Sequence, residues 1–185
     1  MALLSLSVLA GALARAQVGE LLIAAIRGRM HLILDQNQPW SDRTAGELFS
    51  QFNFDYEDQY SSDLALPAFV KDSRDLFDRL GGDKKNICII VSDGRMNKAL
   101  VRPQIAEAEL KDYLYLFIIL DKDNPNDSIL NYKTTHIETE NGQTRVSIQD
   151  YLGDFPFRYY LIIKASLSGY IASRGSPLAH VERLF

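Results

Sequence analysis

The feature that most constrains the fold is an apolar run, Ile87 to Val91, that ends in Ser92-Asp93-Gly94-Arg95. Consecutive apolar residues without alternation predict a strand that is buried on both faces, as in a parallel sheet covered by helices. Gly94 allows the backbone to turn sharply where the strand ends. Because open α/β folds bind ligands at the carboxyl ends of their strands, Asp93 is the first candidate for a metal or ligand contact.

The rest of the chain alternates between helical and strand patterns. Helices are predicted over residues 2–17, 43–51, 64–80, 103–112 and from about 172, and strands over 20–26, 30–34, 86–92, 113–120 and 159–163. This alternation predicts an α/β fold of three layers, in which a mostly parallel sheet has helices on both faces. We expect a single domain that spans residues 1–185.

Several local signals refine these boundaries. Ser41 or Asp42 is expected to cap the helix over residues 43–51, and Pro103 is expected to lie in the first turn of its helix. Asn141-Gly142 between two β-rich segments predicts a two-residue hairpin. The aromatic run from Phe155 to Tyr160 is expected to pack in the core.

The composition fits a folded chain with a sizeable core, since 46% of its 185 residues are hydrophobic and 24% are charged. A net charge of −4 disfavours direct contact with nucleic acid, which needs clustered Lys and Arg. Cys88 is the single cysteine and lies in the predicted buried strand, where core packing is its expected role. The histidines, His31, His136 and His180, are scattered and lack the spacing of zinc ligands.

Residues 2–16 are apolar and allow two interpretations. Ala14-Arg15-Ala16 resembles the small-residue end of a secretory signal, in which case the chain would be a secreted domain. However, no Lys or Arg precedes the apolar stretch, and Leu4 and Val8 lie near one another around a helical wheel. A core helix is the favoured interpretation. The stretch is too short and too interrupted by Ser and Gly to predict a membrane span, so no membrane partner is expected.

Asp121 provides a second acidic strand end, because it follows the apolar run Phe117 to Leu120. If the two strands are neighbours, Asp93 and Asp121 reach the same edge of the sheet, where oxygen ligands suit Mg²⁺ or Ca²⁺. This pair defines one alternative function, a Mg²⁺-dependent phosphate-handling enzyme. The simpler alternative is that Asp121 only turns the chain and that Asp127 or Ser128 caps the next short helix. The sequence contains neither a glycine-rich phosphate loop nor a G-x-S-x-G nucleophile motif.

An ordered set of motifs resembles von Willebrand factor A domains. The strand that ends in Ser92-Asp93-Gly94 is similar to the fourth strand of that family. The further motifs are Phe117-Ile118-Ile119-Leu120-Asp121, Asn124-Pro125, Asp127-Ser128-Ile129-Leu130, Tyr151-Leu152, Phe155-Pro156-Phe157 and Tyr159-Tyr160-Leu161-Ile162-Ile163. Together they resemble the C-terminal metal-ion-dependent adhesion (MIDAS) domains of the midasin family, over roughly residues 5–164. The tail from Ala165 onward departs from the family pattern.

The resemblance implies a Mg²⁺ site built from three loops. The family's third loop supplies an aspartate that Asp93 matches, and its second loop supplies a threonine whose position falls near Ser61 and Ser62. The implied metal ligands in this chain are therefore Asp93, Ser61 and Ser62. The D-x-S-x-S motif of the first loop, which supplies the main ligands in the family, does not occur in the sequence.

The resemblance also implies a function and a location. It indicates a non-enzymatic interaction domain that binds ubiquitin-like domains of ribosome assembly factors on the pre-60S particle in the nucleus. The family's AAA+ ATPase ring has no counterpart in this sequence. The family's opening strand, which lies in the sheet between the second and fourth strands, also has none. Two apolar strands would then lack a neighbour, and marginal stability or self-association is expected.

Overall fold

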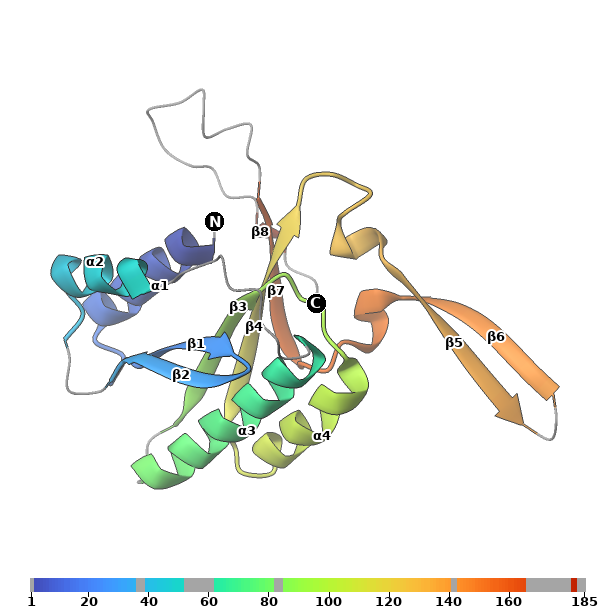
Figure 1. Ribbon diagram of the computed structural model, residues 1–185, viewed down its shortest axis with the longest axis horizontal. Helices are drawn as coiled ribbons and strands as arrows, with labels where there is room; N and C mark the ends of the chain where they lie inside the picture. The colour runs from blue at the N-terminus through green and yellow to red at the C-terminus, as the bar shows by residue number, and fades with distance from the viewer. Residues whose placement is uncertain are drawn as a thin grey trace. The chain divides into compact units, whose positions relative to one another are not determined.

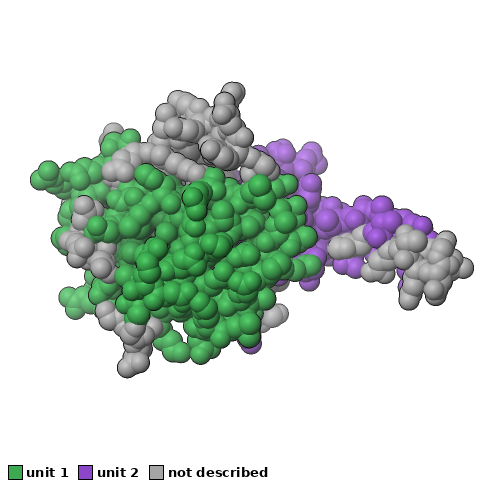
Figure 2. Space-filling view, turned by 60° about the horizontal axis from the view of Figure 1, so that its bottom comes forward, with its two compact units in different colours: residues 1–88, 96–114 green, residues 89–95, 115–185 purple. Residues whose placement is uncertain are grey.

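The computed structural model describes residues 2–35, 39–51, 62–81, 85–140, 143–165 and 181–182 (Figure 1). These residues form two compact units, which Figure 2 distinguishes by colour. Unit 1 comprises residues 1–88 and 96–114, and unit 2 comprises residues 89–95 and 115–185. The single domain expected over residues 1–185 stays a prediction.

Unit 1 contains helices and an antiparallel hairpin. Its elements are α1 (Ala2–Ala16), β1 (Ile23–Arg27), β2 (Arg29–Leu34), α2 (Asp42–Gln51), α3 (Ser62–Leu80) and α4 (Lys98–Glu109). Strands β1 and β2 pair from Arg27 opposite Arg29 to Ile23 opposite Leu34. Gly28 turns the chain between them at a φ of +65°. The predicted strands over residues 20–26 and 30–34 are confirmed, although the first begins three residues later than predicted.

Helix α1 packs against this hairpin. Ala10, Ile23 and Leu34 form a buried cluster, and partly buried apolar side chains surround it. Among these, Trp40 approaches α1 so closely that a Cβ added at Gly11 would lie 3.5 Å from its indole nitrogen. The helix therefore packs against the hairpin through Ala10 and Leu6, whereas Leu4 and Val8, on which the prediction of a core helix was based, are exposed. Its alternative as a secretory signal stays a prediction. Of the described helices, none is both long and apolar enough to cross a membrane.

Helix boundaries in unit 1 follow local capping signals, with one exception. Ser41 caps α2 as predicted, since its Oγ accepts the Thr44 amide at 3.2 Å. Helix α4 begins at Lys98, so the prediction that Pro103 lies in the first turn is wrong. The carbonyl of Asn97 accepts the amides of Leu100 and Val101 and starts the helix earlier. Pro103 then lies in the second turn, where its missing N–H removes one intrahelical hydrogen bond.

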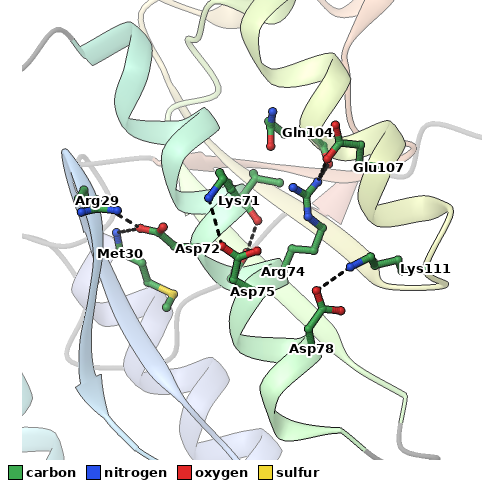
Figure 3. A network of polar contacts seen from close by, with 12 residues as sticks. Arg29, Met30, Lys71, Asp72, Arg74, Asp75, Asp78, Gln104, Glu107 and Lys111 are labelled. Atoms are coloured by element: carbon green, nitrogen blue, oxygen red, sulfur yellow. Dashed lines mark hydrogen bonds and ion pairs between the residues drawn. The ribbon is translucent and has the colours of Figure 1, made fainter.

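Buried and polar contacts hold α3 in unit 1 (Figure 3). Asp72 accepts the Met30 amide of β2 at 3.2 Å, which ties the helix to the hairpin. Arg74 is 8% exposed and forms an ion pair with Glu107 of α4. Val70 and Val101, on the same two helices, are fully buried. The buried Arg74 is therefore paired with a carboxylate that is 56% exposed, beside the apolar contact between the two helices.

A second polar cluster joins α3 to the segment after α4. Lys111 donates to Asp78 at 2.6 Å, and the Tyr113 hydroxyl donates to the same carboxylate at 2.7 Å. These hydrogen bonds, that of Lys111 first, lower the pKa of Asp78 below its usual value. The Tyr113 ring also packs edge-on against Phe77, with centroids 5.2 Å apart. The cluster fixes the chain just before it enters the next strand.

The main sheet has the order β3-β4-β7-β8. Its strands are β3 (Ile87–Ser92), β4 (Leu114–Lys122), β7 (Tyr159–Ala165) and β8 (Val181–Glu182). The first three strands are parallel, and β8 pairs antiparallel to β7. The predicted α/β class and the strands over residues 86–92, 113–120 and 159–163 are confirmed. The helix predicted from residue 172 is wrong at residues 181–182, which pair with β7, and otherwise lies outside the described residues.

Aromatic side chains cover one face of this sheet in unit 2. Phe117 of β4 is fully buried, and its ring centroid lies 5.4 Å from that of Phe155 and 4.8 Å from that of Phe157. Tyr160 of β7 is the register partner of Phe117 and contacts Phe155 at 5.1 Å. The predicted packing role of the aromatic run is confirmed for Phe155, Phe157 and Tyr160, whereas Tyr159 is 47% exposed.

A hairpin of β5 (Lys133–Glu140) and β6 (Gln143–Asp150) lies between β4 and β7 in the chain. Glu140 opposes Gln143, so the connection has the two residues predicted from Asn141-Gly142, which themselves lie outside the described residues. Two short 3₁₀ helices, η1 (Ile129–Asn131) and η2 (Tyr151–Asp154), flank the hairpin. The Tyr151 amide donates to the Tyr132 carbonyl at 2.9 Å, which closes the base of the hairpin.

Among the described residues, the strands form three separate sheets. Strand β1 pairs with β2 alone, and β3 pairs with β4 alone. These are the two strands that were expected to lack a neighbour.

Cys88 lies in β3, where burial raises the pKa of its thiol to about 12, so the thiol is protonated at neutral pH.

Candidate functional site

Asp93 is the first residue after β3, at the carboxyl end of the parallel strands. Its side chain is 55% exposed, whereas five residues of the neighbouring strand β4 are buried. Asp93 therefore follows a parallel strand as predicted and its side chain is exposed, while its role as a metal or ligand contact stays a prediction. We refer to residues 93–97, which connect β3 to α4, as the Asp93 loop.

Contacts with buried side chains fix the backbone of the Asp93 loop at Gly94. This residue has a φ of +78°, a conformation that glycine adopts far more easily than other residues. An added Cβ would lie 2.7 Å from Ile129 Cδ1 and 3.2 Å from Ile119. The Gly94 carbonyl accepts the hydroxyl of Tyr151 at 3.1 Å, and Tyr151 is itself 5% exposed. Glycine is thus required here both by its backbone conformation and by the close approach of the core.

Arg95 contacts the Asp93 side chain and links the Asp93 loop to a second segment. Its amide donates to Asp93 Oδ1 at 3.1 Å, and its guanidinium lies 3.9 Å from Asp93 Oδ2. The same guanidinium donates to the carbonyl of Asp127 at 2.6 Å. Asp127 ends a turn that its amide closes on Asn124 at 3.0 Å. The loop after β3 and the segment after β4 are therefore joined through one arginine.

Asp121 does not join Asp93 as a second ligand. It lies within β4, not after the strand as predicted, and is 3% exposed. Its Oδ2 accepts the Ser128 hydroxyl at 2.6 Å, and its Oδ1 accepts the Ile129 amide at 2.8 Å. Ser128 Oγ in turn caps η1 through the Leu130 amide. Asp121 thus organises the turn after β4, and the capping role considered for Ser128 is confirmed.

Among the described residues, Asp93 does not belong to a cluster of cation ligands. Ser61 lies outside the described residues, and Ser62 begins α3, with its side chain outside them. In the described ranges no three His, Cys, Asp or Glu side chains gather as a cation would require. Asp93 is engaged by the amide and the guanidinium of Arg95. The assignment of Ser61 and Ser62 as ligands remains a prediction.

The sequence did not reveal the residues that shape this site. Arg95 was visible beside Gly94, but nothing in the pattern linked it to Asp127, 32 positions further on. Tyr151 contacts Gly94 across 57 positions. Long-range contacts of single side chains leave no periodic trace in a sequence. The glycine after Asp93 was the one signal that the loop has an unusual backbone.

A parallel sheet of β3, β4 and β7 together with helices, in which Asp93 follows β3 at the carboxyl end of the parallel strands, is consistent with a von Willebrand factor A-like α/β fold. No family model matches the chain. Over 171 residues, 89% of this chain, the sequence is 26% identical to Midasin of Dictyostelium discoideum. The chain covers 3% of the length of that relative. The similarity indicates a midasin-related region.

Proposed function

We propose that this chain is a non-enzymatic interaction domain of the midasin type, acting in assembly of the large ribosomal subunit. Its partners would be ubiquitin-like domains of assembly factors on the pre-60S particle, and its location the nucleus. The observation that carries the proposal is the Asp93 loop. An exposed carboxylate stands there on a backbone that Gly94 and Tyr151 hold rigidly.

Rigidity supports an interaction role, because a fixed polar group loses little entropy when a partner binds. The Asp93 carboxylate is accessible, and its position is set by the Arg95 amide. The similarity to Midasin over 89% of this chain supports the choice of partner class. Direct nucleic-acid binding is not part of the proposal, in keeping with a net charge of −4.

The alternative of a Mg²⁺-dependent phosphate-handling enzyme has less support. It needs Asp93 and Asp121 at one site, and Asp121 is buried with both oxygens accepting hydrogen bonds. A secreted A domain would require cleavage near residue 16. Mass spectrometry of the mature amino terminus and microscopy of a tagged chain would distinguish secretion from nuclear location.

The proposal is tested by binding of a ubiquitin-like domain from a ribosome assembly factor of the same organism. Isothermal titration calorimetry would compare the wild type with Asp93→Ala and with Glu109→Ala, an exposed carboxylate on α4 that serves as the matched control. We expect Asp93→Ala to weaken binding roughly tenfold or more, as for a central contact residue, and Glu109→Ala to leave it unchanged. Equal affinity of all three proteins would refute the assignment of Asp93.

A further inference from the structure

Asp93 already has a positive partner in this chain. The Arg95 amide binds one carboxylate oxygen at 3.1 Å, and the Arg95 guanidinium faces the other at 3.9 Å. Backbone and side chain of one residue therefore engage both oxygens of the carboxylate. A divalent cation that approached Asp93 would meet a guanidinium that is always protonated.

The guanidinium is anchored rather than free to swing away. Its Nη2 donates to the Asp127 carbonyl at 2.6 Å, and its side chain is 40% exposed. A charged donor on a neutral carbonyl is among the stronger hydrogen bonds in proteins. Asp127 is held in its own turn by the bond to Asn124. Displacing Arg95 from Asp93 would therefore also break a contact between two loops.

We propose that the positive charge of Arg95 balances the Asp93 carboxylate. Because of this charge, the site binds its partner without a divalent cation. Arg95 takes the place that a cation would have in balancing the carboxylate, and it positions the carboxylate for a partner. This inference deepens the proposed function, on which its meaning for partner binding rests. It predicts that partner binding is the same in EDTA and in Mg²⁺.

The charge relation gives a direct test without any partner. Removing the guanidinium takes a positive charge away from Asp93 and leaves the donors of the residue 95 amide and the Ser92 hydroxyl, so a divalent cation should bind there more tightly. Mn²⁺ is a suitable probe because its electron paramagnetic resonance signal reports the free ion. We expect wild-type protein to bind Mn²⁺ with a dissociation constant in the millimolar range or weaker, and Arg95→Gln to bind about threefold or more tightly.

Two further variants localise the effect. Arg145→Gln removes an exposed arginine from β6 and should leave Mn²⁺ binding unchanged, which controls for net charge. The double variant Asp93→Asn with Arg95→Gln should lose the gain, because the carboxylate that attracts the ion is gone. Arg95→Met provides a second charge removal with a similar stem if the glutamine variant does not fold.

The outcomes separate the inference from the proposed function. Micromolar Mn²⁺ affinity in the wild type overturns the inference by itself. So does a gain that persists in the double variant, or equal affinities of the wild type and a folded Arg95 variant. Because these titrations contain no partner, failure to bind a ubiquitin-like domain would count against the proposed function and leave the role of Arg95 standing.

Discussion

Replacing Gly94 by alanine tests how rigidly the core holds the Asp93 loop. At a φ of +78° an alanine is strained, which costs about 1–2 kcal/mol. The new Cβ would also lie 2.7 Å from Ile129 Cδ1 and 3.2 Å from Ile119, and both isoleucines are almost fully buried. Forcing an extra carbon into a packed core costs about 1–3 kcal/mol. We therefore expect Gly94→Ala to lower the free energy of unfolding by about 2–5 kcal/mol.

Other glycines of the chain separate the two contributions. Gly81 has a φ of +60° with nothing within 4 Å of an added Cβ, so Gly81→Ala should cost only the backbone strain of about 1–2 kcal/mol. Gly153 has open space and no positive φ, so Gly153→Ala should be nearly neutral or slightly stabilising. Ile129→Val removes the Cδ1 atom that causes the closest approach, and it should recover part of the Gly94→Ala loss in the double variant.

Urea unfolding followed by circular dichroism measures these differences, provided that each variant shows a single transition. The expected order of stability loss is Gly94→Ala, then Gly81→Ala, then Gly153→Ala. If Gly94→Ala lowers the free energy of unfolding no more than Gly81→Ala does, steric contact between the new Cβ and the core does not contribute. If Ile129→Val adds to the loss without any coupling, the contact with Ile129 is not the reason for glycine at this position.

Three further predictions concern other parts of the molecule. Asp121→Asn should destabilise the protein by about 1–3 kcal/mol in urea unfolding, because an amide cannot accept both hydrogen bonds and leaves one buried donor unpaired; unchanged stability would contradict this. The pKa of Asp78 is lowered by Lys111 and Tyr113, so its contribution to stability is present above its unfolded value of 3.8 and is lost as the pH falls through the lower folded value. Asp78→Asn should therefore remove part of the stability difference between pH 6 and pH 3, and equal pH profiles would refute the assignment. Sedimentation velocity should show self-association through the edge of β3 that pairs with no other strand among the described residues, which Ile89→Lys should abolish; a wild type that stays monomeric at high concentration would exclude this.

The regular elements were predictable because they depend on local patterns. The unalternating run of β3 indicated a parallel strand, and the Asn-Gly pair indicated a two-residue hairpin. The expected burial of β3 on both faces is wrong for the described residues, since only Ile90 is buried and Ile87 is 55% exposed. Ser41 was a correct cap because its role depends only on the next three residues. Glycine at position 81 likewise ends α3, where its amide bonds back to the Phe77 carbonyl. Such signals depend on residues only a few positions apart and can be recognised without knowledge of the fold.

The errors arose where distant or competing contacts decide. Pro103 is compatible with a first turn, but Asn97 starts the helix earlier, and the proline is accommodated at the loss of one hydrogen bond. Asp121 resembled an exposed strand end, yet Ser128 and the Ile129 amide supply enough hydrogen bonds for it to remain inside. The pattern of Asp after an apolar run is therefore the same for an exposed carboxylate and for a buried one. Only the following segment distinguishes them.

The two aspartates at this end of the sheet differ in burial, since Asp121 is 3% exposed and the Asp93 side chain is 55% exposed. Asp121 uses its oxygens to shape the turn that carries Asp127, and Asp127 uses its carbonyl to hold Arg95. Arg95 then orients Asp93, the carboxylate that remains exposed. Hydrogen bonds within the protein thus connect the turn after β4 to the Asp93 loop. It follows that Asp121→Asn, although distant from any partner, should weaken partner binding beyond its effect on the folded fraction, because the chain of contacts to Asp93 begins there.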